Sequence, residues 1–248
     1  MIDTHAHLQS LAGGPEAAIT EAAAAGLGRI VCVGDSPELA EEAIGLARAH
    51  PGVVATAGLH PHRADLWDDG VRARLDELLA DPAVVAVGEC GLDYYRERAS
   101  RPAQAAAFAG QVGLAERHRK ALVVHTREAA ADTLAVLRET SAAVVLHCFS
   151  LPDRLDEAVE RGWYASFAGN VTYPSAVELA DAARRVPAEL LLLETDCPYL
   201  SPVPYRGKPN RPHYVLDTLR FVAALRGVEP EQLAAVVEEN AARVFALP

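Results

Sequence analysis

Short apolar runs alternate with longer helix-forming stretches along the whole chain. Runs such as VVAVG (84–88) and LLLLE (190–194) are continuously apolar, like strands of a parallel sheet that is covered on both faces. The expected strands are residues 2–7, 29–34, 53–59, 83–87, 122–125, 143–147, 163–167 and 189–193. The expected helices are residues 15–25, 37–50, 71–80, 102–118, 128–140, 152–161, 175–186, 214–226 and 231–246. About eight strand-plus-helix units predict an α/β protein, a (β/α)8 TIM barrel that forms a single domain over residues 1–248.

The main alternative is a doubly wound open sheet, which binds its ligand at a topological switch point, usually beside a Gly-rich turn. Gly13-Gly14 lacks the spaced G-x-G-x-x-G pattern of such a turn. The polar candidates described below also come from five separate strands, and convergence from that many strands suits a closed barrel better. The sequence contains no low-complexity linker or composition break that would mark a second domain.

Composition limits the partners of the protein. The net charge of -11 over 248 residues argues against a surface that coats nucleic acid generally, although it leaves room for a local cationic pocket. The sequence shows no secretory signal pattern and no apolar run that approaches bilayer length. We therefore expect a soluble cytoplasmic protein without a membrane partner, monomeric or weakly oligomeric, whose four cysteines are reduced.

Imidazole and carboxylate side chains recur where the expected strands end. His5 and His7 share one face of the first strand because a strand sends alternate side chains to the same side. In (β/α)8 enzymes the chemistry takes place at the C-terminal ends of the strands. Nothing structural requires such groups at the ends of five strands, so the pattern predicts a metal centre. The predicted ligands are His5, His7, Glu89, His125, His147 and Asp196.

Six ligands crowd a single tetrahedral ion but suit two ions that share a carboxylate. We expect Glu89 to bridge them, with His5, His7 and Asp196 on one ion and His125 and His147 on the other. The expected cofactors are two divalent ions: zinc, manganese, iron or magnesium. Imidazole-rich ligation favours the first three over magnesium, which prefers oxygen ligands.

Several motifs resemble the TatD family of metal-dependent deoxyribonucleases, in the amidohydrolase superfamily. They span nearly all of the chain: DTHAHL (from Asp3), GLHPH (Gly58), GECGLDYYR (Gly88), HTREA (His125), LHCFS (Leu146), ETDCPYLSP (Glu194), RGKPN (Arg206) and NAARVF (Asn240). The resemblance implies a barrel fold, divalent metal dependence and hydrolysis of phosphodiester bonds in DNA, with the ligands on the six residues already chosen.

The expected mechanism is attack on phosphorus by a water that two metals activate. Asp196 is the expected general base, and Glu89 the second catalytic residue. The net acidity favours short or single-stranded DNA over long duplex, because binding of duplex relies on many cationic contacts. We expect exonucleolytic action on such substrates.

Further residues are candidates for binding the substrate. His60 and His62 resemble phosphate-side histidines of the family, and Arg127 can grip a phosphate with two hydrogen bonds. Tyr95 is a candidate for stacking on a base. Arg206 and Lys208 lie, with Arg211, in a basic loop after a ligand-bearing strand, where a polyanion can dock.

Two other functional classes share these features. A hydrolase of the same barrel type that acts on a small-molecule ester, lactone, amide or phosphotriester would have the same ligands without needing the basic loop. A catalytically idle binding protein would have no reason to retain the complete ligand set.

Overall fold

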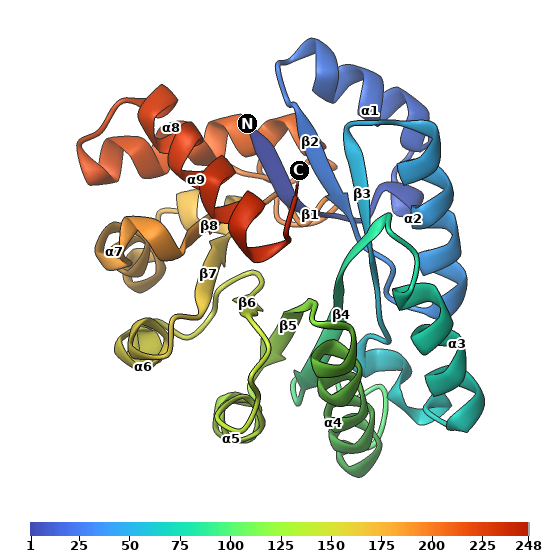
Figure 1. Cartoon of the computed structure of the whole chain (residues 1–248). Helices are drawn as coiled ribbons and strands as arrows, with labels where there is room; N and C mark the ends of the chain where they lie inside the picture. Colours follow the sequence, from blue (N-terminus) through green and yellow to red (C-terminus); the bar gives the residue numbers. More distant parts are fainter. Residues whose placement is uncertain (248) are drawn as a thin grey trace. The chain divides into compact units, whose positions relative to one another are not determined.

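The computed structural model describes residues 1–247, in which parallel strands alternate with helices (Figure 1). The strands are β1 (Ile2–Ala6), β2 (Arg29–Cys32), β3 (Val53–Ala57), β4 (Val84–Asp93), β5 (Ala121–Arg127), β6 (Val144–Leu146), β7 (Tyr164–Phe167) and β8 (Leu191–Leu193). The α-helices are α1 (Pro15–Ala24), α2 (Pro37–Ala49), α3 (Asp69–Leu79), α4 (Arg101–His118), α5 (Ala130–Leu137), α6 (Leu155–Glu160), α7 (Val177–Arg185), α8 (Val215–Arg226) and α9 (Pro230–Val244). The sheet order follows the chain order from β1 to β8. The predicted (β/α)8 barrel is therefore confirmed.

Contacts along the chain divide the molecule into two compact units. The central unit is Val33–His147, and the terminal unit combines Met1–Cys32 with the chain from Cys148 onward. Each unit is described separately below.

In the central unit, local sequence signals start three of the four α-helices. The side chains of Ser36, Asp68 and Ser100 each accept a backbone amide in the first turn of α2, α3 and α4, respectively. These caps satisfy amide groups that have no partner within the helix. In α2 and α4 a proline stands in the first turn, where its missing N–H costs nothing.

Strand β4 is longer than the sequence predicted. We expected it to end at residue 87, with Glu89 at its end, but it continues to Asp93, and Glu89 lies within it. Its register with β5 shifts between Val87 and Cys90. A Cβ atom on Gly91 would lie 2.0 Å from the carbonyl oxygen of His125. Only glycine permits this close approach of β4 to β5, and the irregularity determines where Glu89 points.

In the terminal unit, the two ends of the chain meet. The amide of His7 donates to the carbonyl of Cys197 at 2.9 Å, and the amide of Asp196 donates to the carbonyl of His5 at the same distance. Ala6 and Cys197 form a parallel bridge. The segment that follows β8 thereby pairs with β1, which is how a barrel closes.

Two element boundaries in the terminal unit differ from the sequence prediction. The strand expected over residues 189–193 begins with a 3-10 helix, Ala188–Leu190, and only Leu191–Leu193 form β8. The helix expected over residues 152–161 also opens with a 3-10 turn, Pro152–Arg154, before α6. Within residues 1–247, none of the helices has the length and apolar character that crossing a bilayer requires.

Candidate metal centre

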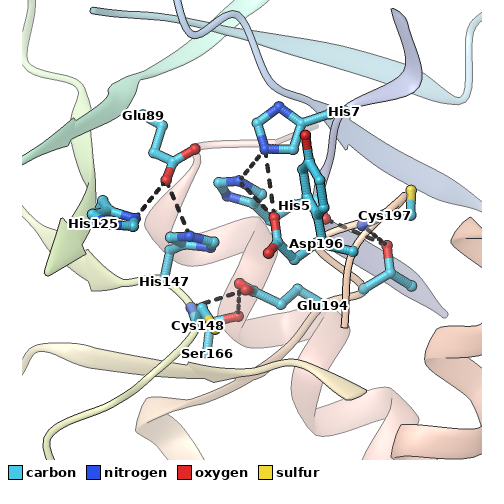
Figure 2. Close-up of polar contacts among 12 residues, drawn as sticks. His5, His7, Glu89, His125, His147, Cys148, Ser166, Glu194, Asp196 and Cys197 are labelled. Carbon is cyan, nitrogen blue, oxygen red and sulfur yellow. Dashed lines mark hydrogen bonds and ion pairs between the residues drawn. The ribbon is translucent and has the colours of Figure 1, made fainter. Parts of the chain in front are cut away.

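The donor set of the central unit is built around Glu89, which β4 holds in a buried position (Figure 2). Oε1 of Glu89 lies 3.0 Å from Nδ1 of His125 and 3.2 Å from Nε2 of His147. Nε2 of His60 lies 3.4 Å from the same oxygen. One carboxylate therefore faces three imidazoles, from the ends of β3, β5 and β6.

This environment keeps Glu89 ionised. Burial alone raises the pKa of its carboxyl group. The charges of His60 and His147 and hydrogen bonds to His125 and His147 outweigh that effect and hold the pKa well below its usual range. A buried carboxylate that stays charged is an effective ligand for a cation.

His60 also contacts the backbone of its own loop. Its Nδ1 accepts the backbone amide of His62 at 3.0 Å. This bond engages one ring nitrogen of His60, while Nε2 faces Glu89.

Asp93 is a candidate functional residue that the sequence analysis missed. It lies four residues after Glu89 on β4 and is fully buried. Its Oδ2 lies 2.8 Å from Nε2 of His62 and 3.2 Å from Nε2 of His125. A metal-binding histidine typically donates its second ring nitrogen to a carboxylate, and Asp93 supplies that partner to His125.

The pKa values of this pair are coupled. Burial raises the pKa of Asp93, but hydrogen bonds with His125, the Arg96 amide and His62 outweigh it and place the pKa below its ordinary value. Burial lowers the pKa of His125, whereas hydrogen bonds to Asp93 and Glu89 raise it, and the net shift is upward. Protons therefore compete with a metal for His125 as the pH falls.

Two buried glutamines on α4 fix the backbone of this donor set. Gln104 accepts the amide of Asp93 at 2.8 Å and donates to the carbonyl of the same residue at 3.1 Å. Gln111, two turns later, makes the equivalent pair of bonds to Leu59, at 2.7 and 3.0 Å. The helix therefore determines where the end of β4 and the start of the His60 loop lie.

The donor set of the terminal unit consists of His5, His7 and Asp196, which Figure 2 shows turned toward one another. Nε2 of His5 and Nε2 of His7 lie 3.4 Å apart. Oδ1 of Asp196 lies 3.5 Å from the His7 nitrogen and 3.8 Å from the His5 nitrogen. The three residues thus present two imidazoles and one carboxylate to a common point.

Asp3 links the strand that carries His5 to the segment that carries Asp196. Its Oδ1 accepts the amide of Thr195 at 2.9 Å, and its Oδ2 accepts the Thr195 hydroxyl at 2.6 Å. Burial raises the pKa of Asp3 to about 8, although the bonds to Thr195 act in the opposite direction. Asp196 follows with a φ angle of 56°, in the left-handed region that aspartate tolerates better than most residues.

Glu194 is a second carboxylate that the sequence analysis missed. Its Oε1 accepts the amide of Cys148 at 2.9 Å, and its Oε2 accepts the hydroxyl of Ser166 at 2.5 Å (Figure 2). Both bonds lie within the terminal unit and leave Glu194 fully buried. Glu194 therefore joins the ends of three segments and is not positioned as a member of the donor set.

The two sets fit divalent metals in their chemistry. Donor atoms of His5, His7 and Asp196 all lie within 4.8 Å of one another, as do those of His60, Glu89 and His125. Mixed imidazole and carboxylate donors suit zinc, manganese and iron. Beside Glu89 in the central unit, the predicted donor His147 lies 3.2 Å from its Oε1, while Nδ1 of His60 is engaged by the backbone.

A family model described as TatD related DNase matches residues 2–246. The chain belongs to the TatD family of metal-dependent hydrolases. This confirms the family that the sequence motifs resemble.

Individual TatD proteins show the extent of the similarity. The chain is 40% identical over 259 residues to the uncharacterized metal-dependent hydrolase TatD of Mycobacterium tuberculosis, covering 100% of this chain and 98% of that one. It is 38% identical over 236 residues to the 3'-5' ssDNA/RNA exonuclease TatD of Cronobacter sakazakii, covering 92% and 90%. The crystal structure of YjjV, a TatD homologue of Escherichia coli, matches with a TM-score of 0.93 at 28% identity, over 100% of this chain and 98% of that chain.

In this TatD-family chain, the residues predicted to bind substrate lie in both units. Exposed Tyr95 and Arg127 contact each other in the central unit, where the Arg127 guanidinium carbon lies 3.8 Å from the centre of the Tyr95 ring. In the terminal unit, the guanidinium of Arg206 lies 4.3 Å from the ring of Tyr173, and Lys208 is exposed in the same loop. Arg211 instead pairs with Glu21 at 3.6 Å.

Proposed function

We propose that this protein is a metal-dependent deoxyribonuclease that removes nucleotides from an end of short or single-stranded DNA. The observation that carries the proposal is the presence of two donor sets of mixed imidazole and carboxylate groups, one in each unit. The 38% identical relative from Cronobacter sakazakii is named as an exonuclease on single-stranded DNA and RNA, which supports this substrate class.

The proposed centre holds two divalent ions. Its ligands are the six predicted residues: His5, His7 and Asp196 in the terminal unit, and Glu89, His125 and His147 in the central unit. Divalent ions supply a nucleophile at neutral pH by acidifying water and stabilise the charge on phosphoryl oxygens. The expectation that Glu89 bridges both ions stays a prediction.

Asp196 is the proposed proton acceptor. Its carboxylate is 14% exposed, so a water molecule can reach it, and its Oδ1 faces the His5 and His7 rings. Positioned proton transfer of this kind typically contributes about 10²–10⁴ to a rate. Glu89, which is 3% exposed, acts as a ligand that holds the imidazoles of the central unit in place.

The remaining candidates would bind the DNA backbone. His60 and His62 lie on the loop beside Glu89 and Asp93, where their partly exposed imidazole groups would approach a phosphate. Arg206 and Lys208 place two exposed cations on one loop of an otherwise acidic protein. A local concentration of cations favours a polyanion even when the net charge of the protein is negative.

The test begins with removal of metal. The protein is dialysed against a chelator and reconstituted separately with zinc, manganese or magnesium. Each sample is then assayed on a single-stranded oligonucleotide carrying a fluorophore at one end or the other, and on the matching duplex. We expect no activity after chelation, recovery with metal, and stepwise shortening of the single strand from one end.

Parallel assays separate this function from its alternatives. The same samples are tested on RNA and on a panel of lactones, amides and phosphotriesters. Turnover of a panel member without cleavage of any oligonucleotide would replace the proposal by a small-molecule hydrolase. Tight metal binding without turnover of any of these substrates would favour a binding protein.

A further inference from the structure

Arg127 and Tyr95 form a stacked pair in the central unit, where β5 and β4 end. Arg127 is the last residue of β5, and Tyr95 follows the last residue of β4 by two positions. The guanidinium carbon of Arg127 lies 3.8 Å from the centre of the Tyr95 ring. The strand register brings the two residues together, because Asp93 on β4 lies opposite Arg127 on β5.

Both members of the pair are exposed. Tyr95 is 53% exposed, which is unusual for a large aromatic side chain, and Arg127 is exposed beside it. Within residues 1–247, no carboxylate forms an ion pair with Arg127. By contrast, neighbouring Arg101 pairs with Glu97. A guanidinium that stacks on a ring keeps its N–H edge available, so Arg127 has donors ready for an external anion.

The pair is tied to the donor set through Asp93. Oδ2 of Asp93 lies 3.2 Å from Nε2 of His125. Oδ1 of the same carboxylate accepts the amides of Tyr95 at 3.0 Å and Arg96 at 2.8 Å. The amide of Tyr94 also donates to the carbonyl of Arg127 at 2.9 Å. One carboxylate therefore positions both a proposed metal ligand and the turn that carries Tyr95.

We propose that the Arg127–Tyr95 pair is a subsite for the phosphate group next to the one that is cleaved. Tyr95 holds the guanidinium flat, and Arg127 donates two hydrogen bonds to oxygens of that phosphate. This inference rests on the proposed function and deepens it, since it assigns recognition of a second backbone phosphate to the stack. It gives Tyr95 a supporting role in place of the base stacking predicted from sequence.

Four variants test the pair. Arg127→Ala removes the guanidinium, and Arg127→Lys keeps the charge but cannot bind in a planar, bidentate way. Tyr95→Leu removes the ring, and Tyr95→Phe keeps it. Arg98→Ala is the matched control, because Arg98 is an exposed arginine of the same loop without a ring contact.

The first readout is release of the terminal nucleotide from a labelled oligonucleotide. We expect kcat/KM to fall about 10- to 100-fold in Arg127→Ala, because a charge-assisted bidentate contact is lost. Arg127→Lys and Tyr95→Leu should show most of this loss, while Tyr95→Phe and Arg98→Ala should stay near wild type. Hydrolysis of bis(4-nitrophenyl) phosphate, which has a single phosphate, should be unchanged in Arg98→Ala and should fall far less in Arg127→Ala than cleavage of the oligonucleotide does.

The second readout alters the substrate. A neutral methylphosphonate replaces the linkage next to the terminal one, and only the first cleavage is followed. The rate of this first cleavage should fall by the same 10- to 100-fold for wild type, and the rate for Arg127→Ala should not fall further. A methylphosphonate that slows both proteins equally would overturn the inference. So would an abasic nucleotide that abolishes the Arg127 effect while the methylphosphonate leaves it intact.

A binding measurement separates this inference from the proposed function. Fluorescence anisotropy of the same oligonucleotide is recorded with chelator present, where no cleavage is expected. A Kd that rises about 10-fold or more in Arg127→Ala would support the subsite even if no preparation cleaves DNA. Normal cleavage and binding by Arg127→Ala would contradict the subsite inference without affecting the nuclease proposal.

Discussion

The two units assemble similar donor sets by different routes. In the central unit, one long strand carries both Glu89 and Asp93, and neighbouring strands bring imidazoles to them. In the terminal unit, His5 lies in β1 and His7 follows directly after it, while Asp196 comes from the far end of the chain. Asp3 and Thr195 join these segments across 192 positions in sequence. One set depends on local strand geometry and the other on closure of the barrel.

The supporting carboxylates differ in charge as a result. Asp93 accepts from two imidazoles and two amides, and these donors hold its pKa below the ordinary value despite burial. Asp3 accepts from Thr195 and the His5 amide, but burial outweighs these bonds and its pKa rises to about 8. The proposed ligands in the two units are thus supported by a carboxylate with a lowered pKa in one case and by one with a raised pKa in the other.

The largest expected effects come from Glu89→Gln and Asp196→Asn, one variant in each unit. Each removes a proposed ligand, so each protein should lose about 10²- to 10⁴-fold in kcat. Because Glu89 is expected to bridge both ions, Glu89→Gln should weaken retention of both, whereas Asp196→Asn should weaken mainly the ion held in the terminal unit. Metal content by mass spectrometry and steady-state rates on oligonucleotide measure this. Asp153→Asn, at a carboxylate that is 71% exposed, is the control.

A different result would break the comparison. If Glu89→Gln kept one ion at full occupancy, Glu89 would not bridge the two ions, and if Asp196→Asn released none, Asp196 would not be a ligand. If Asp196→Asn kept a near-normal rate with saturating metal, its assignment as the proton acceptor would be wrong.

An intermediate effect is expected from Asp93→Asn and a smaller one from Asp3→Asn. Loss of the ionised Asp93 should cost about 1–3 kcal/mol of the free energy of unfolding and weaken metal affinity about 10- to 100-fold. Asn resembles a protonated aspartate, so Asp3→Asn should be close to wild type below about pH 4, where Asp3 is protonated in both the folded and the unfolded state. Urea unfolding with chelator present measures both stabilities.

The same pair should show different pH trends. The folded-state pKa of Asp3 lies above its unfolded value of 3.8, so wild-type stability is lost as pH rises between about 4 and 8. Relative to wild type, Asp3→Asn should therefore gain stability over that range. Asp93 has a lowered pKa, so its contribution is already complete above about pH 5 and is lost only in acid. A falling relative stability of Asp3→Asn from pH 5 to 8 would contradict this assignment.

The smallest expected effect lies in the helix layer, away from both sets. Asp76 on α3 accepts from His118 and Arg117 on α4, each at 2.6 Å, and chiefly the His118 bond lowers its pKa. Asp76→Asn should cost at most about 1 kcal/mol of stability near pH 6, because such surface pairs are screened by solvent. The lowered pKa means that this cost should shrink as pH falls below about 4. Thermal melts at several pH values measure it, and unchanged metal content and rate serve as its control.

Much of this architecture could be predicted from sequence because the signals are local. Continuous apolar runs separated by helix-forming stretches predicted the barrel. Imidazoles near the ends of those runs predicted the donor sets. Asp93 was missed because Gly88 and Gly91 look like breaks in a strand, whereas they allow β4 to approach β5 and continue. Glu194 was missed because it stands next to Asp196, and its partners Cys148 and Ser166 are remote in sequence.

Contacts between elements account for the rest of what the sequence could not predict. Gln104 and Gln111 look like ordinary polar residues in an Ala-rich helix, and only the fold shows that both are fully buried. The stack of Arg127 on Tyr95 likewise depends on strand register that no local pattern specifies. Both residues were predicted as substrate contacts, but their joint arrangement was not.

The paired bonds of Gln104 and Gln111 have a consequence for how this scaffold can change. They hold Asp93 and Leu59 from α4. The turn over residues 95–98 has exposed side chains and contacts Asp93 through the backbone amides of Tyr95 and Arg96. Evolution or a protein engineer can therefore replace the side chains of that turn, and with them the preference for a ligand, while the backbone bonds still hold Asp93.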